Sequence, residues 1–242
     1  MVETLADLSA ALGVPFISGK DSSSGTFATA SGRIDVPPTL VVAAMGRLPD
    51  VRKVISKEFK RPGNRLVLVG RSDAGALGGS VYADSCGQRG DRLFDAYDAS
   101  SIRKLWDTLL ELHKQAAYVS ASAVAEGGIL LRLFEAAWGS GGYGVRIFLD
   151  AFSAAGARHG MPAQSPGRKD GAIFGEFVGS VLLEVPSKFD LDRRLADVPY
   201  RVIGEVLAEP RLVLQDRTNL VWQDTTEALG EVWRSAFREV IE

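Results

Sequence analysis

Apolar and polar positions in the first sixty residues predict one helix and two strands. A helix ending at Gly13 is predicted by leucines at helical spacing, namely Leu5, Leu8 and Leu12. The apolar run Val14 to Ile17 predicts a short strand that leads into a polar loop. A second strand is predicted at Thr39 to Met45, where the Pro-Pro pair at 37–38 marks an extended entry.

From residue 64 to residue 149 the apolar pattern predicts alternating strands and helices. Arg65 to Val69 is predicted as a strand, followed by a glycine-rich loop. An amphipathic helix is predicted by one apolar face, made of Ile102, Leu105, Trp106, Leu109, Leu110 and His113. A helix at Ile129 to Trp138 and a strand at Val145 to Leu149 follow.

The last third predicts more strands and one closing helix. Strands are expected at Phe177 to Val185 and Val202 to Val206, with a short one at Arg211 to Leu214. Asp224 and Glu227 have the spacing of a capping box, which predicts a final helix that ends near Val240. Because strands and helices alternate without a strict βαβ rhythm, the fold class is predicted as layered α+β.

Breaker residues divide the chain into three predicted segments. Pro62 and Gly63 mark a boundary, so residues 1–61 form one segment and residues 63–210 the main domain. Residues 211–242 are expected to be a C-terminal linker and helix. Two strands and a helix cannot form a stable core alone, so residues 1–61 resemble the end of a domain whose first part is missing.

Composition excludes several classes of protein. The 242 residues are 46% hydrophobic and 24% charged with net charge −2, which gives no basic excess for nucleic acid or anionic membranes. No apolar run approaches the ~18 residues of a transmembrane helix. Cys86 is the only cysteine, which excludes an intrachain disulfide and fits the cytoplasm. His113 and His159 lack zinc spacing, and His113 is expected to pack on its helix face.

The loop "SGKDSSSG" is the first candidate site. Gly19 lets a ligand approach the backbone, Lys20 offers a charge for phosphate, and Asp21 is a hard oxygen ligand suited to Mg2+. Ser22 and Ser23 can donate hydrogen bonds to phosphoryl or substrate oxygens. The alternative is a solvated turn, because this is not a P-loop pattern.

Two glycine-rich turns are weaker candidates for nucleotide or substrate binding. Gly78, Gly79 and Ser80 end the run "GALGGS", which could surround an anion with backbone amides or be a plain turn. Gly127 and Gly128 open a predicted helix, where exposed amides and the helix dipole favour phosphate. The alternative at this second turn is close helix packing.

The order of these motifs resembles one family. The runs "LGVPFISGKDSSSGTF", "VPPTLVVAAMG", "ALGGS", "EGGILLRLFEAAWGSGGYGVRI" and "IFGEFVGSVLLEV" are similar to the second synthetase half of phosphoribosylformylglycinamidine synthase. The resemblance covers approximately residues 5 to 210. It implies a fold like aminoimidazole ribonucleotide synthase, with residues 63–210 as its C-terminal-like domain. Residues 1–61 would then be the remnant of a first, ATP-binding subdomain that normally pairs with a counterpart.

The resemblance implies a ligase of purine biosynthesis. The family converts formylglycinamide ribonucleotide, ATP and glutamine-derived ammonia to formylglycinamidine ribonucleotide, ADP and phosphate. By motif, Gly19, Lys20 and Ser22 would contact nucleotide and substrate, and Asp21 would hold magnesium. The implied partners are the missing N-terminal synthetase half and a glutaminase domain or subunit.

Departures from the family pattern predict that the chain is inactive alone. Ser122 and Ala123 stand where many relatives have His-Asp, and Phe177-Val178 replaces the Ser-Gln of the catalytic half. Since the catalytic histidine loop is also absent, no catalytic residue is assigned. The start in mid-domain favours a cloned fragment over a native short protein or a degenerate half.

Two other functions stay open, together with one expectation about assembly. One alternative is another ATP-dependent member of the same superfamily; the other is a non-catalytic scaffold that binds a structural nucleotide or supports a partner. The truncated first subdomain is expected to expose an apolar strand edge, which predicts self-association as a homodimer.

Overall fold

The computed structural model describes residues 2–21, 25–37, 39–88, 92–94, 98–153, 169–236 and 238. The chain forms two compact units, Met1–Val54 and Ile55–Glu242, which are described separately. The boundary at residues 61–63 and the separate segment 211–242 stay predictions about domain organisation.

The first unit contains one helix and one hairpin. Helix α1 spans Val2–Leu12 and ends at Gly13, whose φ of 67° fits the left-handed helix stop that the sequence predicts. Strands β1 (Thr26–Thr29) and β2 (Gly32–Asp35) pair antiparallel. A short 3-10 helix, η1, follows at Val51–Lys53.

Both strands predicted for this unit are wrong. Val14 to Ile17 and the described residues of Thr39 to Met45 are assigned to no strand and pair with no described segment. Their apolar side chains are exposed, as Ile17 at 88% and Met45 at 93% show. An apolar run becomes a strand only when a partner satisfies its backbone groups, and the described residues supply no such partner.

The second unit is built on a seven-stranded mixed sheet in the order β4-β6-β3-β7-β5-β8-β9. The pairings are antiparallel except for β5 with β8, which is parallel. The strands are β3 (Arg65–Val69), β4 (Ser120–Ala123), β5 (Gly144–Phe148), β6 (Val181–Val185), β7 (Tyr200–Leu207), β8 (Arg211–Asp216) and β9 (Asn219–Thr225).

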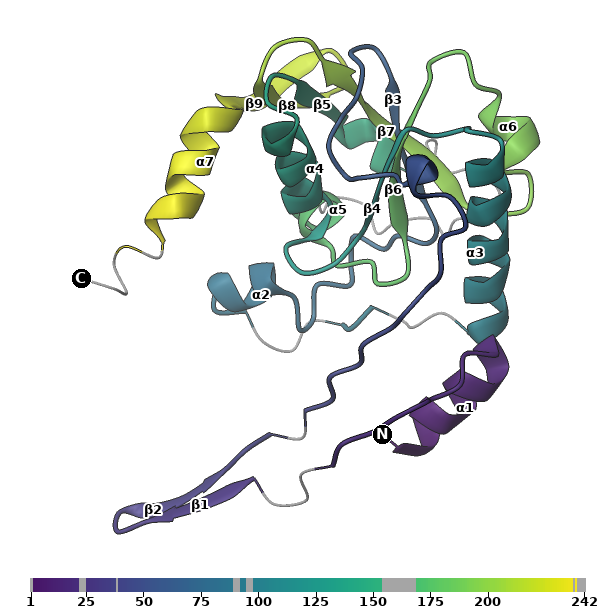
Figure 1. The fold of residues 1–242 in the computed structure, drawn as a ribbon. Helices are drawn as coiled ribbons and strands as arrows, with labels where there is room; N and C mark the ends of the chain where they lie inside the picture. Colours follow the sequence, from purple (N-terminus) through teal and green to yellow (C-terminus); the bar gives the residue numbers. More distant parts are fainter. Residues whose placement is uncertain are drawn as a thin grey trace. The chain divides into compact units, whose positions relative to one another are not determined.

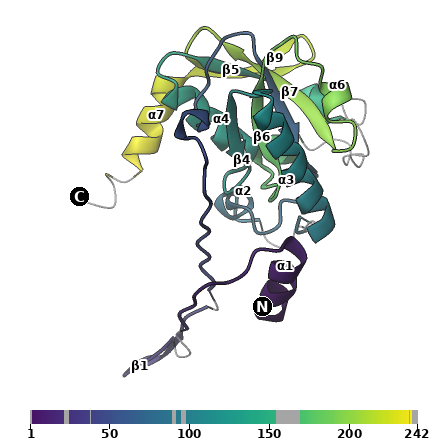
Figure 2. The ribbon, with the colours of Figure 1, turned by 45° about the vertical axis from the view of Figure 1, so that its right-hand side comes forward.

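Helices cover both faces of this sheet (Figures 1 and 2). The helices are α2 (Val81–Ser85), α3 (Ala99–Lys114), α4 (Gly128–Gly139), η2 (Leu149–Phe152), α5 (Lys169–Phe174), α6 (Leu191–Arg194) and α7 (Thr226–Ser235). Side chains alternate along each strand, so one face packs on α4, α5 and η2 and the other on α3 and α6. The predicted α+β class is confirmed.

Most predicted elements of this unit exist, with shifted boundaries. Strand β6 begins at Val181, because Phe177 lies in a turn before it. On α3 the predicted apolar face is partly wrong: Trp106 and Leu110 are 43% and 57% exposed, while Leu112 is buried. Helix α7 is capped by the hydroxyl of Thr225, which accepts from the Ala228 amide, and not by Asp224.

The N-terminus of α3 shows why a polar residue starts this helix. Asp98 is the N-cap, and its carboxylate accepts from the Ser101 amide at 2.9 Å. Hydrogen bonds from the side chains of Ser100 and Ser101 hold the pKa of Asp98 well below its ordinary value. The carboxylate therefore stays charged at the positive end of the helix dipole.

Gly144, at the start of β5, allows the connection between β7 and β8 to cross over this strand. Strand β5 lies between β7 and β8, although β7 and β8 are joined directly by residues 208–210. A Cβ at Gly144 would lie 2.2 Å from the carbonyl oxygens of Glu209 and Arg211. The connection can pass over β5 only because this position has no side chain.

The buried carboxylate of Glu184 anchors the segment that enters the sheet. Glu184 on β6 is 1% exposed and accepts hydrogen bonds from the Lys60 amide (2.8 Å), the Arg61 amide (2.9 Å) and Asn64 Nδ2 (2.7 Å). Three donors compensate the cost of burying this charge. The turn that precedes β3 is thereby fixed to the neighbouring strand.

Replacing Glu184 with alanine is expected to destabilise the protein by about 3 to 5 kcal/mol, because three donors lose a buried charged partner. Urea unfolding followed by circular dichroism measures this change. Glu126→Ala removes an exposed carboxylate and serves as the control, with a change of about 0.5 kcal/mol or less. Equal midpoints for the two variants would contradict the anchoring role.

Candidate functional site

The first glycine-rich turn leads directly into helix α2. Gly79 has φ of 73°, and Ser80 is the buried N-cap, whose hydroxyl accepts from the Ala83 amide at 3.1 Å. The Ser80 hydroxyl also donates to the Leu77 carbonyl at 2.7 Å. Gly78 bridges to Leu93, and its amide donates to the Arg92 carbonyl at 3.0 Å. This turn is therefore held by hydrogen bonds within it and by one to Arg92.

The second turn opens helix α4 and packs closely on the end of α5. Gly127 and Gly128 have φ of 78° and 69°, a region that favours glycine. A Cβ at Gly128 would lie 2.5 Å from the carbonyl carbon of Phe174. Glycine is thus needed here both for the backbone angle and for the close approach of two backbones.

Glu176 joins the two turns. Its Oε1 accepts a hydrogen bond from the Val81 amide, directly after the first turn, and another from the Gly127 amide in the second. Both distances are 2.9 Å. Two loops that the sequence offers as separate candidates are therefore brought together by one carboxylate oxygen.

Aromatic packing supports the same junction, by which we mean the place where Glu176 joins the two glycine-rich turns. Phe174 stacks on Tyr82 of α2, with ring centroids 4.2 Å apart and planes 4° from parallel. The Tyr82 hydroxyl donates to Asp170 of α5 at 3.4 Å. Burial and the nearby carboxylate of Asp170 raise the pKa of Tyr82 above its ordinary value, so this hydroxyl stays protonated at neutral pH.

The backbone amides of Gly78, Ser80, Gly127 and Gly128 have partners within the protein. The Ser80 amide donates to the Leu77 carbonyl at 3.1 Å and the Gly128 amide to the Ala125 carbonyl at 2.9 Å. With Gly78 bound to Arg92 and Val81 and Gly127 bound to Glu176, few amides remain for an anion. Nucleotide or substrate binding by these turns stays a prediction.

The charged loop of the first unit is exposed. Gly19, Lys20 and Asp21 are all exposed, and the Lys20 ammonium donates to the backbone carbonyl of Asp21. Ser22 and Ser23 lie outside the described residues. Within the described ranges, no three His, Cys, Asp or Glu side chains gather closely enough to hold a metal ion. Asp21 would therefore need ligand phosphate oxygens or further groups to complete a magnesium site, and its role stays a prediction.

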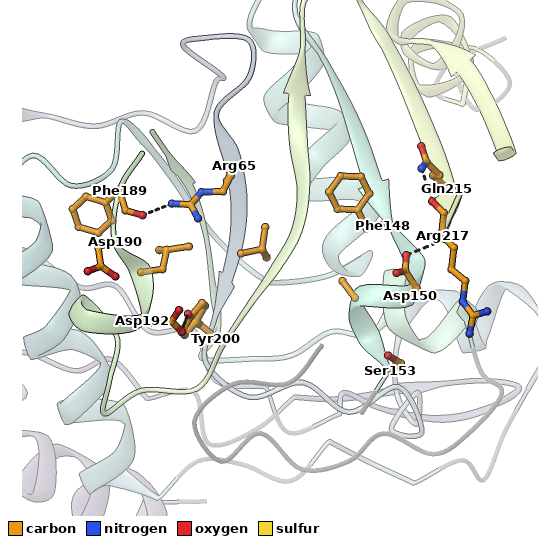
Figure 3. A pocket seen from close by; sticks show the side chains of 13 residues that line it. Arg65, Phe148, Asp150, Ser153, Phe189, Asp190, Asp192, Tyr200, Gln215 and Arg217 are labelled. Atoms are coloured by element: carbon orange, nitrogen blue, oxygen red, sulfur yellow. Dashed lines mark hydrogen bonds between the residues drawn. The ribbon is translucent and has the colours of Figure 1, made fainter. Parts of the chain in front are cut away.

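A hollow of about 610 Å³ lies on the sheet face that carries α6, and no predicted site residue lines it. Figure 3 shows Arg65, Asp192 and Tyr200 on one side of this hollow and Asp150 with Arg217 on the other. Asp150 already accepts from the Arg217 amide at 3.0 Å, and Asp192 accepts from the Tyr200 hydroxyl. Each of these carboxylates thus fixes one side of the rim of the hollow.

Arg201 is a buried cation that the sequence gives no reason to expect. It is 0% exposed, and its Nη1 donates to the carbonyls of Ala151 (2.8 Å) and Ser153 (2.9 Å). Burial lowers the pKa of Arg201 to about 10, so the guanidinium stays charged at neutral pH. The side chain fixes the end of η2 against β7.

Comparison with known proteins gives a consistent family. No protein-family model matches the chain. The phosphoribosylformylglycinamidine synthase subunit PurL of Deinococcus radiodurans is 26% identical over 99% of the chain, and that of Leifsonia xyli is 31% identical over 89%. This chain is homologous to part of PurL. It covers 31% and 27% of these two PurL proteins, so it spans about a third of their length or less.

Solved PurL structures share the fold. The Thermotoga maritima PurL structure complexed with FGAR matches 94% of the chain with a TM-score of 0.65 at 18% identity. The PurLQS structure of the same organism matches 93% with a TM-score of 0.63 at 17% identity. The chain covers 36% and 34% of those two structures. The family resemblance found from motifs is confirmed.

No helix in the described ranges is both long enough and apolar enough to cross a bilayer.

Substitution of Gly128 by alanine is expected to destabilise the junction more than the same change at Gly141. Gly141 has φ of 72° but open space around it, so Gly141→Ala reports the backbone angle alone. The backbone angle costs about 1 to 2 kcal/mol in both variants. In Gly128→Ala the clash with Phe174 adds to it, and urea unfolding measures the difference. Equal losses would show that the close approach is not required.

Proposed function

We propose that this chain supplies part of the synthetase region of a phosphoribosylformylglycinamidine synthase, an ATP-dependent C–N ligase of purine biosynthesis. The observation that carries the proposal is homology to PurL proteins over 89–99% of the chain. In this reading the chain corresponds to the C-terminal part of the second synthetase half. The remaining polypeptide and a glutaminase would provide the catalytic histidine loop and ammonia in the cytoplasm.

The proposed ligands are a magnesium nucleotide and formylglycinamide ribonucleotide. Thermotoga maritima PurL has been solved in complexes with ATP, ADP and FGAR, which supports nucleotide and substrate binding by the family. Magnesium would neutralise phosphate charge when bound, with Asp21 as its ligand. Lys20 would add a positive charge near phosphate, and Gly19 would let the ligand approach the backbone. Ser22 and Ser23 are the proposed hydrogen-bond donors.

The chemistry needs more groups than this chain provides. The proposed reaction activates an amide oxygen with ATP, after which ammonia displaces phosphate. The chain's own contribution is therefore to position the ligand and balance charge, which are the main demands of phosphoryl transfer. Turnover requires the partner polypeptide.

One observation favours a second function, a non-catalytic scaffold that supports the catalytic half. Phe177 is 0% exposed and packs in the core, and Val178 is 66% exposed, so neither replaces a polar catalytic group. The internal hydrogen bonds of the glycine-rich turns point the same way.

Calorimetric titration of the chain with Mg-ATP separates these functions. A nucleotide-binding wall predicts measurable binding that Asp21→Ala weakens about tenfold, the effect of losing one charge-assisted contact. Asp7→Ala, an exposed acid on α1, is the control and should leave the affinity unchanged. Absence of binding favours the scaffold or an incomplete site. Ammonia-dependent ligase turnover by the isolated chain would contradict the assignment of catalysis to the missing part.

The exposed apolar side chains of residues 1–54 predict self-association. Ile17, Val41 and Met45 are 88%, 89% and 93% exposed, and such surfaces normally mark an interface. Light scattering after size exclusion should show dimers or larger species, and the double variant Val41→Lys with Met45→Lys should shift them toward monomer. A monomer at high concentration without these substitutions would refute the prediction.

A further inference from the structure

We infer that Glu176 is the positioning residue that sets the spacing between the two glycine-rich turns, acting as an internal anion for the amides of Val81 and Gly127. The inference rests on the proposed function, since it concerns the two turns that the sequence analysis offers as candidates for nucleotide or substrate binding. The hydrogen-bond acceptor of these two amides is therefore a carboxylate of the protein and not a bound phosphate.

The geometry gives one oxygen atom two donors. Oε1 of Glu176 is 2.9 Å from the Val81 nitrogen and 2.9 Å from the Gly127 nitrogen. Val81 is the first residue of α2 and Gly127 is the N-cap of α4, so one oxygen accepts from amides at the starts of two helices. Hydrogen bonds to an ionised acceptor are stronger than neutral ones, so this single atom couples the two starts.

The backbone around Glu176 is fixed independently of its carboxylate. The Val178 amide donates to the Glu176 carbonyl at 2.8 Å, and the Ser180 amide donates to the Phe177 carbonyl at 2.9 Å. Phe177 is fully buried and packs on Phe94, with ring centroids 5.5 Å apart. The carboxylate is therefore presented from a rigid turn, as a positioning group requires.

A second set of contacts keeps the junction folded when the carboxylate is removed. Phe174 stacks on Tyr82 of α2, and the Phe174 backbone lies against Gly128 at the start of α4. These contacts do not involve the Glu176 side chain. Truncation at position 176 thus tests the two hydrogen bonds and not the existence of the fold.

Amide hydrogen exchange followed by NMR tests the assignment directly. In Glu176→Ala the Val81 and Gly127 amides should both exchange about tenfold faster or more, because each loses a charge-assisted hydrogen bond. Glu176→Gln keeps an acceptor oxygen without the charge, so both rates should fall between those of the wild type and the alanine variant. Glu126→Gln removes a neighbouring exposed carboxylate and should change neither rate.

The two amides must respond together for the inference to hold. Acceleration of only one of them in Glu176→Ala would overturn it, as would unchanged exchange of both. If Glu176→Ala unfolds, Glu176→Gln is compared with Glu126→Gln. Faster exchange of both the Val81 and Gly127 amides in Glu176→Gln alone supports the inference, and faster exchange of only one amide, or of neither, overturns it.

Addition of Mg-ATP to the labelled wild-type chain distinguishes this inference from the proposed function. A positioning role predicts that the Val81 and Gly127 resonances keep their places while other residues of the site shift. It also predicts a weaker nucleotide affinity in Glu176→Ala that Glu176→Gln partly restores. Tighter binding in Glu176→Ala, with both amides shifting, would identify them as ligand donors and overturn the inference. If no resonance shifts at all, nucleotide binding fails, and the exchange rates still decide the role of Glu176.

Discussion

The main constraint on the second unit is the burial of the Glu184 carboxylate within the sheet. A charge in the interior is tolerated only with full hydrogen bonding, and the segment 60–64 supplies three donors to it. The chain must therefore pass this point before it enters β3, which fixes the position of β3 beside β6. Both layers of helices pack on the sheet that contains this pair of strands.

A second carboxylate performs a similar task at the candidate site. Glu176 holds two helix starts as Glu184 holds a turn, so both glutamates act as internal acceptors for backbone amides. Glu184 is buried whereas Glu176 is half-buried, beside the glycine-rich turns. Within one domain, the same chemistry thus stabilises the core in one place and organises a surface in another.

Periodicity predicted several elements that pack on the sheet, missed a sheet strand made of small residues, and wrongly predicted strands where packing is absent. Strands β3, β5 and β7 and helix α4 were predictable, because their apolar residues recur with the period of the structure they form. Strand β4, with the sequence SASA, lacked that signal because its small side chains carry little hydrophobic pattern. Val14 to Ile17 form an apolar run typical of a strand, but no described segment pairs with them. At the site, the glycines were visible in the sequence, but the acceptor that joins them comes from a distant turn.

Gly144 has a consequence for the order in which the sheet assembles. Strands β7 and β8 are adjacent in sequence, and such neighbours readily close into a local hairpin, yet here β5 occupies the place between them. Early closure of that hairpin would shut β5 out of the sheet. Assembly therefore depends on a long-range pairing that forms before or together with a short-range turn, which slows folding relative to a simple meander. A side chain at position 144 would obstruct that insertion as well as the finished crossing.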